Sequence, residues 1–229
     1  MQYKVLYMSG ITLYGYILSQ PVRSVLEYLI LSNINYTLIS LDSSKSDLST
    51  SEFTKMNPFQ SVPAIVHDDY SLWESAAIIT YLSEAFNINN QYYPKDLKIR
   101  ARINAYLHWH HQNIRDPCND YLDGKLAGPK RYNKPELTES EEFLLKTRFD
   151  QMLEDIKWSI KPTGFIARTD FLTIADIFAY NELTLVSKRL FNLEDHPEIK
   201  SWYDSIELID SIKQLTDQAN KIYSEILNE

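Results

Sequence analysis

The fold of the first part of the chain is decided by residues 57–86, NPFQSVPAIVHDDYSLWESAAIITYLSEAF. Two short runs, Ala64–His67 and Ser71–Trp73, flank an Asp68–Asp69 turn and predict two strands joined by that turn. Apolar residues then recur at helical spacing, so an amphipathic helix is expected over Ser75–Phe86. Two strands followed directly by a helix indicate a small α/β unit.

Upstream of this stretch, strand and helix signals alternate. Residues 11–18, ITLYGYIL, favour a strand, and Pro21 then stands in the first turn of a helix that continues through residues 22–32. A second short strand is expected at residues 36–40, before a polar segment from Leu41 to Lys55 that holds at most a short helix. The predicted order is therefore strand, helix, strand, short helix, strand, strand, helix.

From Pro94 onward, the strand patterns disappear and apolar residues recur at helical spacing. We therefore expect an α/β domain over residues 1–90 and an all-helical domain over residues 91–229, joined around residues 87–95. A loop rich in helix breakers is expected from Gly124 to Pro135. Helices are expected over residues 96–114, from Thr138 to about Ile160, from near Thr173, from Pro197, and over residues 208–227.

The composition excludes several classes of protein. The chain has 229 residues, of which 44% are hydrophobic, and its 23 Lys and Arg against 31 Asp and Glu give a net charge of −8. This hydrophobic fraction supports a folded core and excludes a disordered chain. The negative charge argues against a nucleic-acid binder, since such proteins usually carry a basic surface. No run approaches the roughly 18 apolar residues of a membrane-spanning helix, so we expect no membrane span.

Cys118 is the only cysteine, which excludes an intramolecular disulfide framework and a cysteine-based zinc site. A reducing compartment therefore fits best. Cys118 follows Pro117 and has no His or Lys at an activating spacing, so we expect an inert thiol. His108, His110 and His111 form a cluster, but only the first and last share a helical face, and no carboxylate lies one turn away on that face. We expect a surface or pocket-wall role for them and no metal site.

Five segments of the chain resemble the theta class of the glutathione transferases, and together they extend over about residues 11–205. They are SQPVRS (19–24), NPFQSVPAI (57–65), WESAAIITYL (73–82), YYPKDLKIRARINAYLHW (92–109) and FLTIADIFAYNEL (171–183). The resemblance implies an α/β thioredoxin-like domain that binds glutathione (1–90), followed by an all-α helical-bundle domain that binds a small hydrophobic electrophile (91–229). It also implies a cytosolic homodimer with a substrate cleft between the domains. The implied co-substrate is glutathione, with no metal or organic prosthetic group.

Such an enzyme must convert the thiol of glutathione to a thiolate near neutral pH, because the thiolate is the nucleophile. Ser19 stands between the first predicted strand and a helix that begins at Pro21, so its hydroxyl and the helix N-terminus can both face an anion. One hydrogen bond to a charged partner contributes about 1.5–3 kcal/mol, which lowers a thiol pKa by about one to two units. From spacing alone, a helix N-cap is the favoured interpretation of Ser19. The resemblance instead implies a catalytic thiolate stabiliser, with Gln20 as a weaker polar contact to the tripeptide.

A second strand-like run, Tyr3 to Met8, precedes the strand that the resemblance requires. If this run were the first strand, Ser9 would replace Ser19 as the candidate. We reject this alternative because the SQP motif and its helix follow Ser19. The extra run also prompts the hypothesis that translation starts at Met8, which an intact mass beginning at Met1 would contradict.

The resemblance assigns further contacts to glutathione. It implies a cis Val62–Pro63 peptide bond, with the backbone N–H and C=O of Val62 paired to the cysteinyl backbone of the tripeptide. An ordinary loop proline is the alternative. Ser75 opens a helix whose free N–H groups favour the γ-glutamyl carboxylate, and Glu74 can attract the α-amino group. Helix capping by Ser75 is a second interpretation, compatible with the first.

Two positions depart from the family pattern. Theta-class proteins usually carry a His or Lys between the second strand and the NP motif to hold the glycyl carboxylate. In this chain, only Lys45 and Lys55 can substitute. Ser61 precedes Val62 where a lysine is common in relatives, so its hydroxyl or backbone would have to serve. We therefore expect a lower affinity for glutathione.

In the helical domain, Arg115 matches a position where theta-class proteins often carry an arginine near the thiol. A cation there would stabilise the thiolate or a departing anion. From spacing alone, a solvated arginine at a helix end is the favoured interpretation. Thr173 and Asp176 match a helix-capping element of the fold, and we assign them to folding.

The leading hypothesis is an enzyme that attacks small electrophiles, such as alkyl halides, epoxides or organic peroxides, with glutathione thiolate. Dehalogenation or isomerisation at the same site is a related possibility that the sequence does not separate from it. An alternative of a different class is a non-catalytic, transferase-like binding or assembly module. The presence of Ser19, Glu74 and Ser75 weighs against that alternative.

Overall fold

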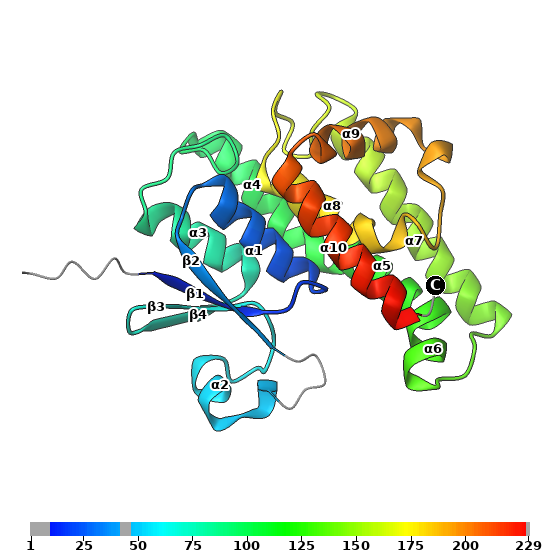
Figure 1. The fold of residues 1–229 in the computed structure, drawn as a ribbon. Helices are drawn as coiled ribbons and strands as arrows, with labels where there is room; N and C mark the ends of the chain where they lie inside the picture. The colour runs from blue at the N-terminus through cyan, green and yellow to red at the C-terminus, as the bar shows by residue number, and fades with distance from the viewer. Residues whose placement is uncertain (1–9, 42–46, 228–229) are drawn as a thin grey trace, which may run out of the picture. The chain divides into compact units, whose positions relative to one another are not determined.

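A four-stranded sheet forms the centre of the first part of the chain in the computed structural model, which describes residues 10–41 and 47–227 (Figure 1). The strand order is β2-β1-β3-β4. Strand β1 pairs parallel with β2 and antiparallel with β3, and β3 pairs antiparallel with β4. The strands are β1 (Ile11–Gly15), β2 (Tyr36–Ser40), β3 (Ala64–His67) and β4 (Tyr70–Trp73).

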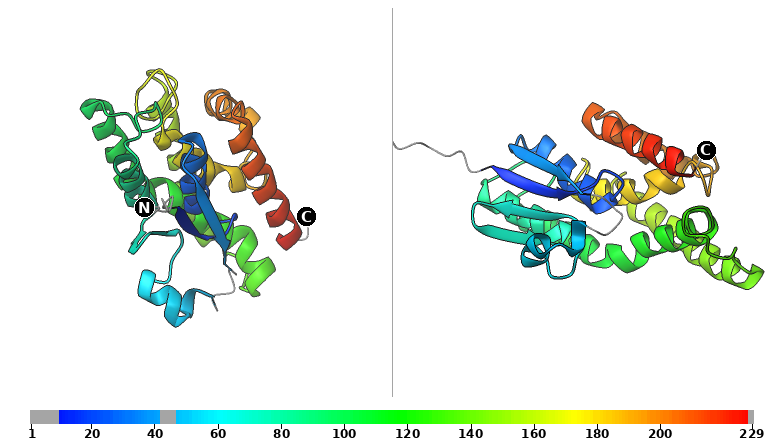
Figure 2. Two further views of the ribbon diagram at one scale, coloured as in Figure 1. Left: turned by 60° about the vertical axis from the view of Figure 1, so that its left-hand side comes forward. Right: turned by 60° about the horizontal axis from the view of Figure 1, so that its bottom comes forward.

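The chain divides into two compact units, Met1–Ile88 and Asn89–Glu229, which are described separately. In the first unit, α1 and α3 pack against each other on one side of the sheet, and α2 lies on the other side (Figures 1 and 2). Alternate residues of β1, beginning with Ile11 and Leu13, are fully buried, as expected for a strand with a covered face. The helices of this unit are α1 (Gln20–Leu31), the short 3₁₀ turn η1 (Asp47–Ser49), α2 (Ser51–Met56) and α3 (Ser75–Ala85).

The predicted element order of this unit is confirmed, but the first strand is shorter than expected. It ends at Gly15 and does not continue to Leu18. Helix α1 approaches closely at this point: a Cβ on Gly15 would lie 2.5 Å from Cγ2 of Val22, so only glycine fits here. The chain turns immediately after Gly15, and the backbone N–H of Ser19 donates to the carbonyl of Tyr16 (3.0 Å).

The second unit is helical in its described residues. Helix α8 lies at its centre, with all of its residues buried, and α4, α5, α9 and α10 pack around it. The helices are α4 (Leu97–His110), α5 (Asp116–Leu122), α6 (Gly128–Tyr132), α7 (Glu139–Ile160), α8 (Ile174–Val186), α9 (Pro197–Glu207) and α10 (Asp210–Leu227). Shorter helical turns are the π-helical η2 (His111–Arg115) and η3 (Asp123–Ala127) and the 3₁₀ turn η4 (Leu193–Asp195).

Two expectations for this unit are wrong. The helix predicted over residues 96–114 ends as a regular α-helix at His110 and passes through η2 into α5. The segment Gly124–Pro135 is not a loop, because η3 and α6 occupy most of it. Pro129 stands in the first turn of α6, where a proline is tolerated, and the helix ends at Asn133 with a left-handed φ of 50°.

The two capping elements of the helical unit form as predicted. Thr138 and Glu141 make a capping box at the start of α7. At α8, the buried Asp176 carboxylate accepts hydrogen bonds from the backbone N–H and hydroxyl of Thr173. It also accepts from the backbone N–H of Ile166 (2.8 Å) and from Nε1 of Trp202 (3.0 Å). Asp176 therefore joins the start of α8 to a loop and to α9.

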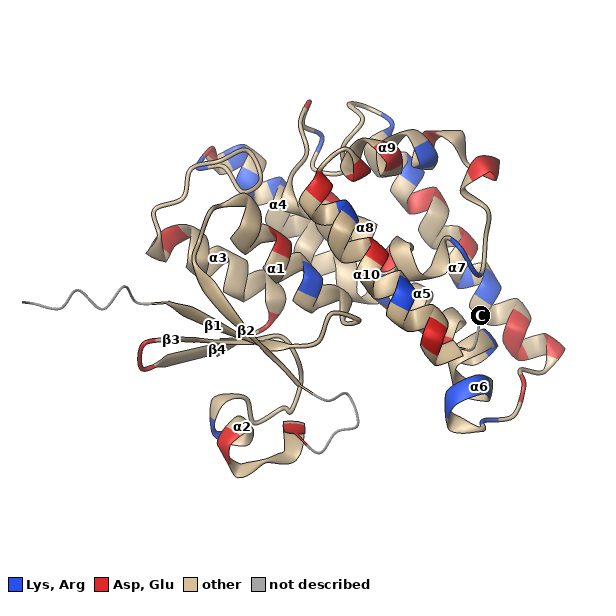
Figure 3. Cartoon of the chain, in the orientation of Figure 1, with Lys and Arg blue, Asp and Glu red and all other residues tan. Residues whose placement is uncertain are grey.

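Charged side chains of both signs are spread along the outer helices, as Figure 3 shows for α7 and α10. Pairs one turn apart include Lys146 with Asp150 and Lys213 with Asp217. Such exposed pairs contribute about 0.3–0.5 kcal/mol each. Among the described residues, no helix is both long enough and apolar enough to cross a membrane.

Candidate active site

Ser19 lies at the N-terminal end of α1, directly after the turn that follows β1. Its backbone is extended (φ −73°, ψ 117°), as at a helix N-cap, and its carbonyl accepts from the N–H of Arg23 (3.0 Å). Its side chain nevertheless makes no capping hydrogen bond, and within the described part of the chain its hydroxyl has no partner. The residue is buried. The hydroxyl is therefore not used to cap the helix.

The N-terminal ends of α1 and α3 are electrostatically alike. Neither helix has an acidic residue in its first turn. The free N–H groups and helix dipole at these ends therefore keep their positive potential, which favours an anion. Gln20 is buried at the first position of α1, and Ser75 is buried at the first position of α3. The Ser75 hydroxyl has no hydrogen-bond partner among the described residues.

The register of the sheet brings the predicted residues of the first unit to one end. Tyr14, near the end of β1, pairs with Ala64 at the start of β3, and Ala64 pairs with Trp73 at the end of β4. The turn that holds Ser19, the segment before Ala64 and the start of α3 therefore leave the sheet at the same end. These segments carry Ser19, Gln20, Ser61, Val62, Pro63, Glu74 and Ser75.

The Val62–Pro63 peptide bond is cis, as the resemblance implied. The loop before it is held by the buried side chain of Asn57, whose Nδ2 donates to the backbone oxygen of Ser61 (2.8 Å) and to its hydroxyl (3.1 Å). Asn57 Oδ1 accepts from the N–H of Phe59 (3.0 Å). The Ser61 side chain is thus part of the loop's own bonding, and Asn57 is a supporting residue that the sequence reasoning did not single out.

Glu74 has an unusual backbone conformation for a residue that is not glycine, with φ 70° and ψ 110°. It is exposed and stands at the N-cap of α3 without a side-chain capping bond. Non-glycine residues with positive φ cost about 1–3 kcal/mol and often occur at functional sites. This conformation sets the direction in which the chain enters α3, directly before Ser75.

Of the two lysines predicted to hold the glycyl carboxylate, Lys45 and Lys55, the structure describes one. Lys55 lies in the last turn of α2 and is exposed. Lys45 lies outside the described residues, as do the run from Tyr3 to Met8 and Ser9. Lys55 is therefore the one of the two predicted lysines whose position is known.

Arg115 is not a solvated arginine at a helix end. Its Nη1 donates to Oε1 of Glu182 on α8 at 2.8 Å, and the Glu182 side chain is only 2% exposed. Nε2 of His110 lies 3.5 Å from the same oxygen. Sequence reasoning missed both partners of this cluster. Its sequence signal, a glutamate within the largely apolar stretch of α8, was present in the FLTIADIFAYNEL segment.

The π-helical turn η2 explains why both side chains reach Glu182. His110 and Arg115 are five residues apart, and in an α-helix, at 3.6 residues per turn, they would point in clearly different directions. The wider i to i+5 turn of η2 brings such residues onto the same side. An α-helical pattern over residues 96–114 could not reveal this arrangement.

Burial sets the protonation states in this cluster. Burial acts to raise the pKa of Glu182, but the Arg115 charge and the contacts from His110 hold that pKa below its ordinary value. Burial lowers the pKa of His110 in spite of Glu182. Burial also raises the pKa of the Tyr106 and Cys118 side chains well above their usual ranges. The cluster therefore consists of an ionised Glu182, a charged Arg115 and three neutral side chains at pH 7.

The remaining predictions in this unit concern metals and thiols. His108 is exposed and His110 is buried, so the three neighbouring histidines do not share one environment, and the surface or pocket-wall role is wrong for His110. The described residues contain no group of three or more His, Cys, Asp or Glu placed to hold a metal ion. Cys118 is a buried free thiol, and its raised pKa fits an unreactive side chain.

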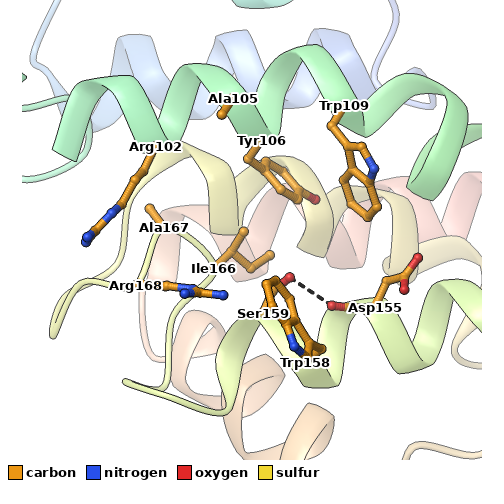
Figure 4. Close-up of a pocket in the computed structure, with 10 residues that line it drawn as sticks. All are labelled: Arg102, Ala105, Tyr106, Trp109, Asp155, Trp158, Ser159, Ile166, Ala167 and Arg168. Atoms are coloured by element: carbon orange, nitrogen blue, oxygen red, sulfur yellow. Dashed lines mark hydrogen bonds between the residues drawn. The ribbon is translucent and has the colours of Figure 1, made fainter. Parts of the chain in front are cut away.

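A cavity of about 560 Å³ lies within the helical unit between α4, α7 and the segment Ile166–Arg168 (Figure 4). Trp109 on α4 and Trp158 on α7 belong to opposite walls of this cavity in Figure 4. The Arg168 guanidinium lies 4.5 Å from the centre of the Trp158 ring. The further lining residues are Arg102, Ala105, Tyr106, Asp155 and Ser159.

Known proteins share both the sequence pattern and the fold. A family model described as the glutathione S-transferase N-terminal domain matches residues 9–84. Glutathione S-transferase theta-3 of Mus musculus is 31% identical over 209 residues, covering 86% of this chain and 82% of that protein. Glutathione S-transferase theta-1 of Homo sapiens is 30% identical over 204 residues, with coverage of 86% and 82%.

Solved structures extend this similarity to three dimensions. Apo human glutathione S-transferase T1-1 matches with a TM-score of 0.86 at 26% identity, covering 96% of this chain and 92% of that one. Human glutathione transferase theta-2, in complex with glutathione and an unknown ligand, matches with a TM-score of 0.82 at 28% identity, covering 96% and 89%. The similarity therefore includes the α/β unit and the helical unit alike. The chain belongs to the theta class of the glutathione transferase family and is an enzyme of that family.

Proposed function

We propose that the chain conjugates glutathione, through its thiolate, to small hydrophobic electrophiles such as alkyl halides, epoxides and organic peroxides. The observation that carries this proposal is the Ser19 hydroxyl. It lies at a helix N-cap, but it does not cap the helix, and it has no hydrogen-bond partner in the described part of the chain. Ser19 is 7% exposed, and a serine at a helix N-cap usually uses its hydroxyl to cap, so a hydroxyl that is left uncapped at this position is available to a ligand.

Ser19 donates a hydrogen bond to the sulfur of glutathione in this mechanism and stabilises the thiolate more than the thiol. At about 1.5–3 kcal/mol for a bond to a charged partner, it lowers the thiol pKa by about one to two units. The N-terminal end of α1 adds its positive potential. With an alkyl halide or an epoxide, the thiolate attacks carbon, and the halide departs or the ring opens to an alkoxide that takes up a proton, without a covalent intermediate on the enzyme. With an organic peroxide, the thiolate attacks oxygen, the O–O bond breaks to release an alcohol after protonation, and a second glutathione reduces the resulting glutathione sulfenic acid to give glutathione disulfide and water.

The rest of the tripeptide is held by the other residues at the same end of the sheet. The N–H and C=O of Val62, before the cis Pro63, pair with the cysteinyl backbone. The N-terminus of α3, which includes Ser75, takes the γ-glutamyl carboxylate, and Glu74 takes the α-amino group. Gln20 and Ser61 make weaker polar contacts, and Lys55 is the remaining candidate for the glycyl carboxylate.

The helical unit supplies the electrophile-binding residues and a cation, Arg115, that stabilises the thiolate or the departing anion. We place the enzyme in the cytoplasm, where glutathione keeps thiols reduced. We also propose a homodimer. It is supported by exposed apolar side chains on α4 and α7, among them Trp109 and Trp158 beside the cavity of Figure 4.

Ser19→Ala tests the central assignment. We expect glutathione-dependent turnover at pH 7 to fall at least tenfold, and the pKa of the bound thiol, followed by ultraviolet absorbance of the thiolate, to rise by about one to two units. Ser83→Ala is a control, because the Ser83 hydroxyl is buried without a partner within the described residues but lies near the C-terminal end of α3. A folded Ser19→Ala protein with unchanged rate and thiol pKa would refute the role of Ser19.

A further inference from the structure

The turn between β1 and α1, which leads to Ser19, is held by the side chain of Arg23. Nη1 of Arg23 donates to the carbonyl of Ile17 at 2.9 Å and to the carbonyl of Leu18 at 3.2 Å. A guanidinium is planar and presents its donors in a rigid fork, so it binds two neighbouring carbonyls in one defined geometry. These bonds join the first turn of α1 to the two residues directly before Ser19.

The backbone of Ser19 is held on both sides as well. Its N–H donates to the carbonyl of Tyr16, and its own carbonyl accepts from the N–H of Arg23, both at 3.0 Å. Each of the four carbonyls from residue 16 to residue 19 therefore accepts a hydrogen bond from within the first unit. The Ser19 hydroxyl makes no capping bond, so its direction depends on the backbone that these bonds fix.

Arg23 is too deeply buried to be a ligand contact itself. Its exposed fraction is 0%, whereas Ile17 and Leu18 are only half-buried. Water could bind the carbonyls of such a turn at little cost, but a buried charge is costly to keep. A buried guanidinium at this place therefore indicates that the shape of the turn matters. Arg23 acts on whatever Ser19 binds through the backbone between them.

We propose that Arg23 is a positioning residue for the reaction, whose guanidinium fixes the turn so that the Ser19 hydroxyl points at the glutathione sulfur. This assignment rests on the proposed function, in which Ser19 stabilises the thiolate. A hydrogen bond weakens steeply when its angle departs from the preferred range, so a small rotation of the turn weakens the stabilisation without removing the hydroxyl.

The experiment measures kcat, KM for glutathione and the pKa of the bound thiol, the last by ultraviolet absorbance of the thiolate, in the full chain. Arg23→Lys keeps the positive charge but replaces the rigid fork by one ammonium on a flexible stem. We expect the thiol pKa to rise by about 0.5–1 unit and kcat at pH 7 to fall about three- to tenfold. KM for glutathione should change by less than about twofold, because the other proposed contacts lie on other segments.

A double variant separates action through Ser19 from a general effect. In the Ser19→Ala background, Arg23→Lys should cause no further rise in the thiol pKa, because the hydroxyl that it positions is absent. Arg100→Lys is the matched control. Arg100 also donates to two neighbouring carbonyls, those of Pro94 (Nε, 2.9 Å) and Tyr93 (Nη2, 3.4 Å), but that segment carries no proposed glutathione contact. It should leave the thiol pKa unchanged.

A second variant covers the case in which Arg23→Lys does not fold. Glu27 lies one helical turn after Arg23 and is 1% exposed. Arg23→Met with Glu27→Met removes both buried charges at similar volume, a kind of change that often preserves stability. The turn again loses its donor, so the same rise in thiol pKa is expected. Circular dichroism and urea unfolding establish that each variant is folded.

The outcomes are distinct. An unchanged thiol pKa and kcat in the folded Arg23 variant overturns the positioning role alone. An equal rise in the thiol pKa with and without the Ser19 hydroxyl, or an equal rise in Arg100→Lys, also overturns it. A folded Ser19→Ala protein with unchanged rate and thiol pKa overturns the proposed role of Ser19 and, with it, that of Arg23.

Discussion

At the residue scale, the candidate site contains two serine side chains that make no hydrogen bond within the described residues. Ser19 occupies the N-cap of α1, where serine usually caps, and Ser75 is the first residue of α3, yet both hydroxyls lack a partner in the described chain. From spacing alone, capping is the favoured interpretation of Ser19, and for Ser75 capping is compatible with ligand binding, since spacing cannot show where a hydroxyl points. The structure separates the two interpretations for Ser19, because the absence of a capping bond is an observation about geometry.

Glu74 offers a test of function against stability. Its φ of 70° is costly for a glutamate and free of steric cost for a glycine. We expect Glu74→Gly to raise the free energy of unfolding by up to about 1 kcal/mol in urea titrations. The same change should raise KM for glutathione, because the carboxylate proposed to hold the α-amino group is lost.

Asp68→Gly is the control for this prediction. Asp68 also has a positive φ, 57°, but it lies in the turn between β3 and β4, at the opposite end of these strands from Glu74. It should gain stability with no change in KM for glutathione. An unchanged KM in Glu74→Gly would show that the α-amino group is held elsewhere.

The pH dependence of stability follows from His110. Burial lowers its folded-state pKa, so the unfolded chain binds more protons over the range between the folded value and about 6.5. The free energy of unfolding is therefore highest above about pH 6.5 and falls as the pH drops below it. We expect His110→Asn to flatten this slope between pH 7 and 5.5 in urea titrations. His108→Asn, at an exposed position of the same helix, should leave the slope as it is.

Glu182 affects the free energy of unfolding at a lower pH than His110 does, so it does not obscure the slope assigned to His110. Its folded-state pKa is lowered, so its contribution to stability is complete above the unfolded value of about 4.3 and is lost as the pH falls through the folded value. Only the slope between pH 7 and 5.5 is assigned to His110. An equal slope in wild type and His110→Asn would mean that other groups carry it.

At the element scale, the sequence predicted helices well where start signals were present and poorly where the backbone departed from α-helical geometry. The Thr138 and Thr173 signals located α7 and α8 to within a residue. The π-helical turn η2 was invisible, because apolar residues recur at nearly the same spacing on either side of it. Arg115 was found only through the resemblance, and its partner Glu182 was missed because contacts between distant segments leave no local signal.

The capping of α8 by Asp176 gives an element-scale prediction. Asp176→Ala would leave four buried donors without their acceptor: the N–H of Ile166, the N–H and the hydroxyl of Thr173, and Nε1 of Trp202. At about 1–3 kcal/mol for each, we expect a loss of about 3 kcal/mol or more in the free energy of unfolding. Asp204→Ala, which removes an exposed pair with Lys200 on α9, should cost at most about 1 kcal/mol. A loss below about 1 kcal/mol in Asp176→Ala would mean that water or another acceptor replaces the carboxylate.

At the scale of the whole molecule, the proposed homodimer gives the last prediction. Helix α7 exposes Leu144 and Trp158, which are fourteen residues apart and so lie on nearly the same helical face, with Trp158 66% exposed. The cavity beside Trp158 is walled by Trp109 of α4 (Figure 4). Large apolar side chains exposed on one helical face are a candidate interaction surface. A second copy of the chain is the partner that the family membership favours.

Trp158→Glu tests this surface, since a carboxylate placed there would be desolvated on association. We expect the wild-type chain to have the mass of a dimer by light scattering at micromolar concentration, and the variant to have the mass of a monomer with its helical content retained. Leu208→Glu is the control, because Leu208 is 83% exposed but lies outside α4 and α7. It should remain a dimer. If Trp158→Glu also remains a dimer, the subunits associate through another surface, and the exposure of Trp158 then requires a different explanation.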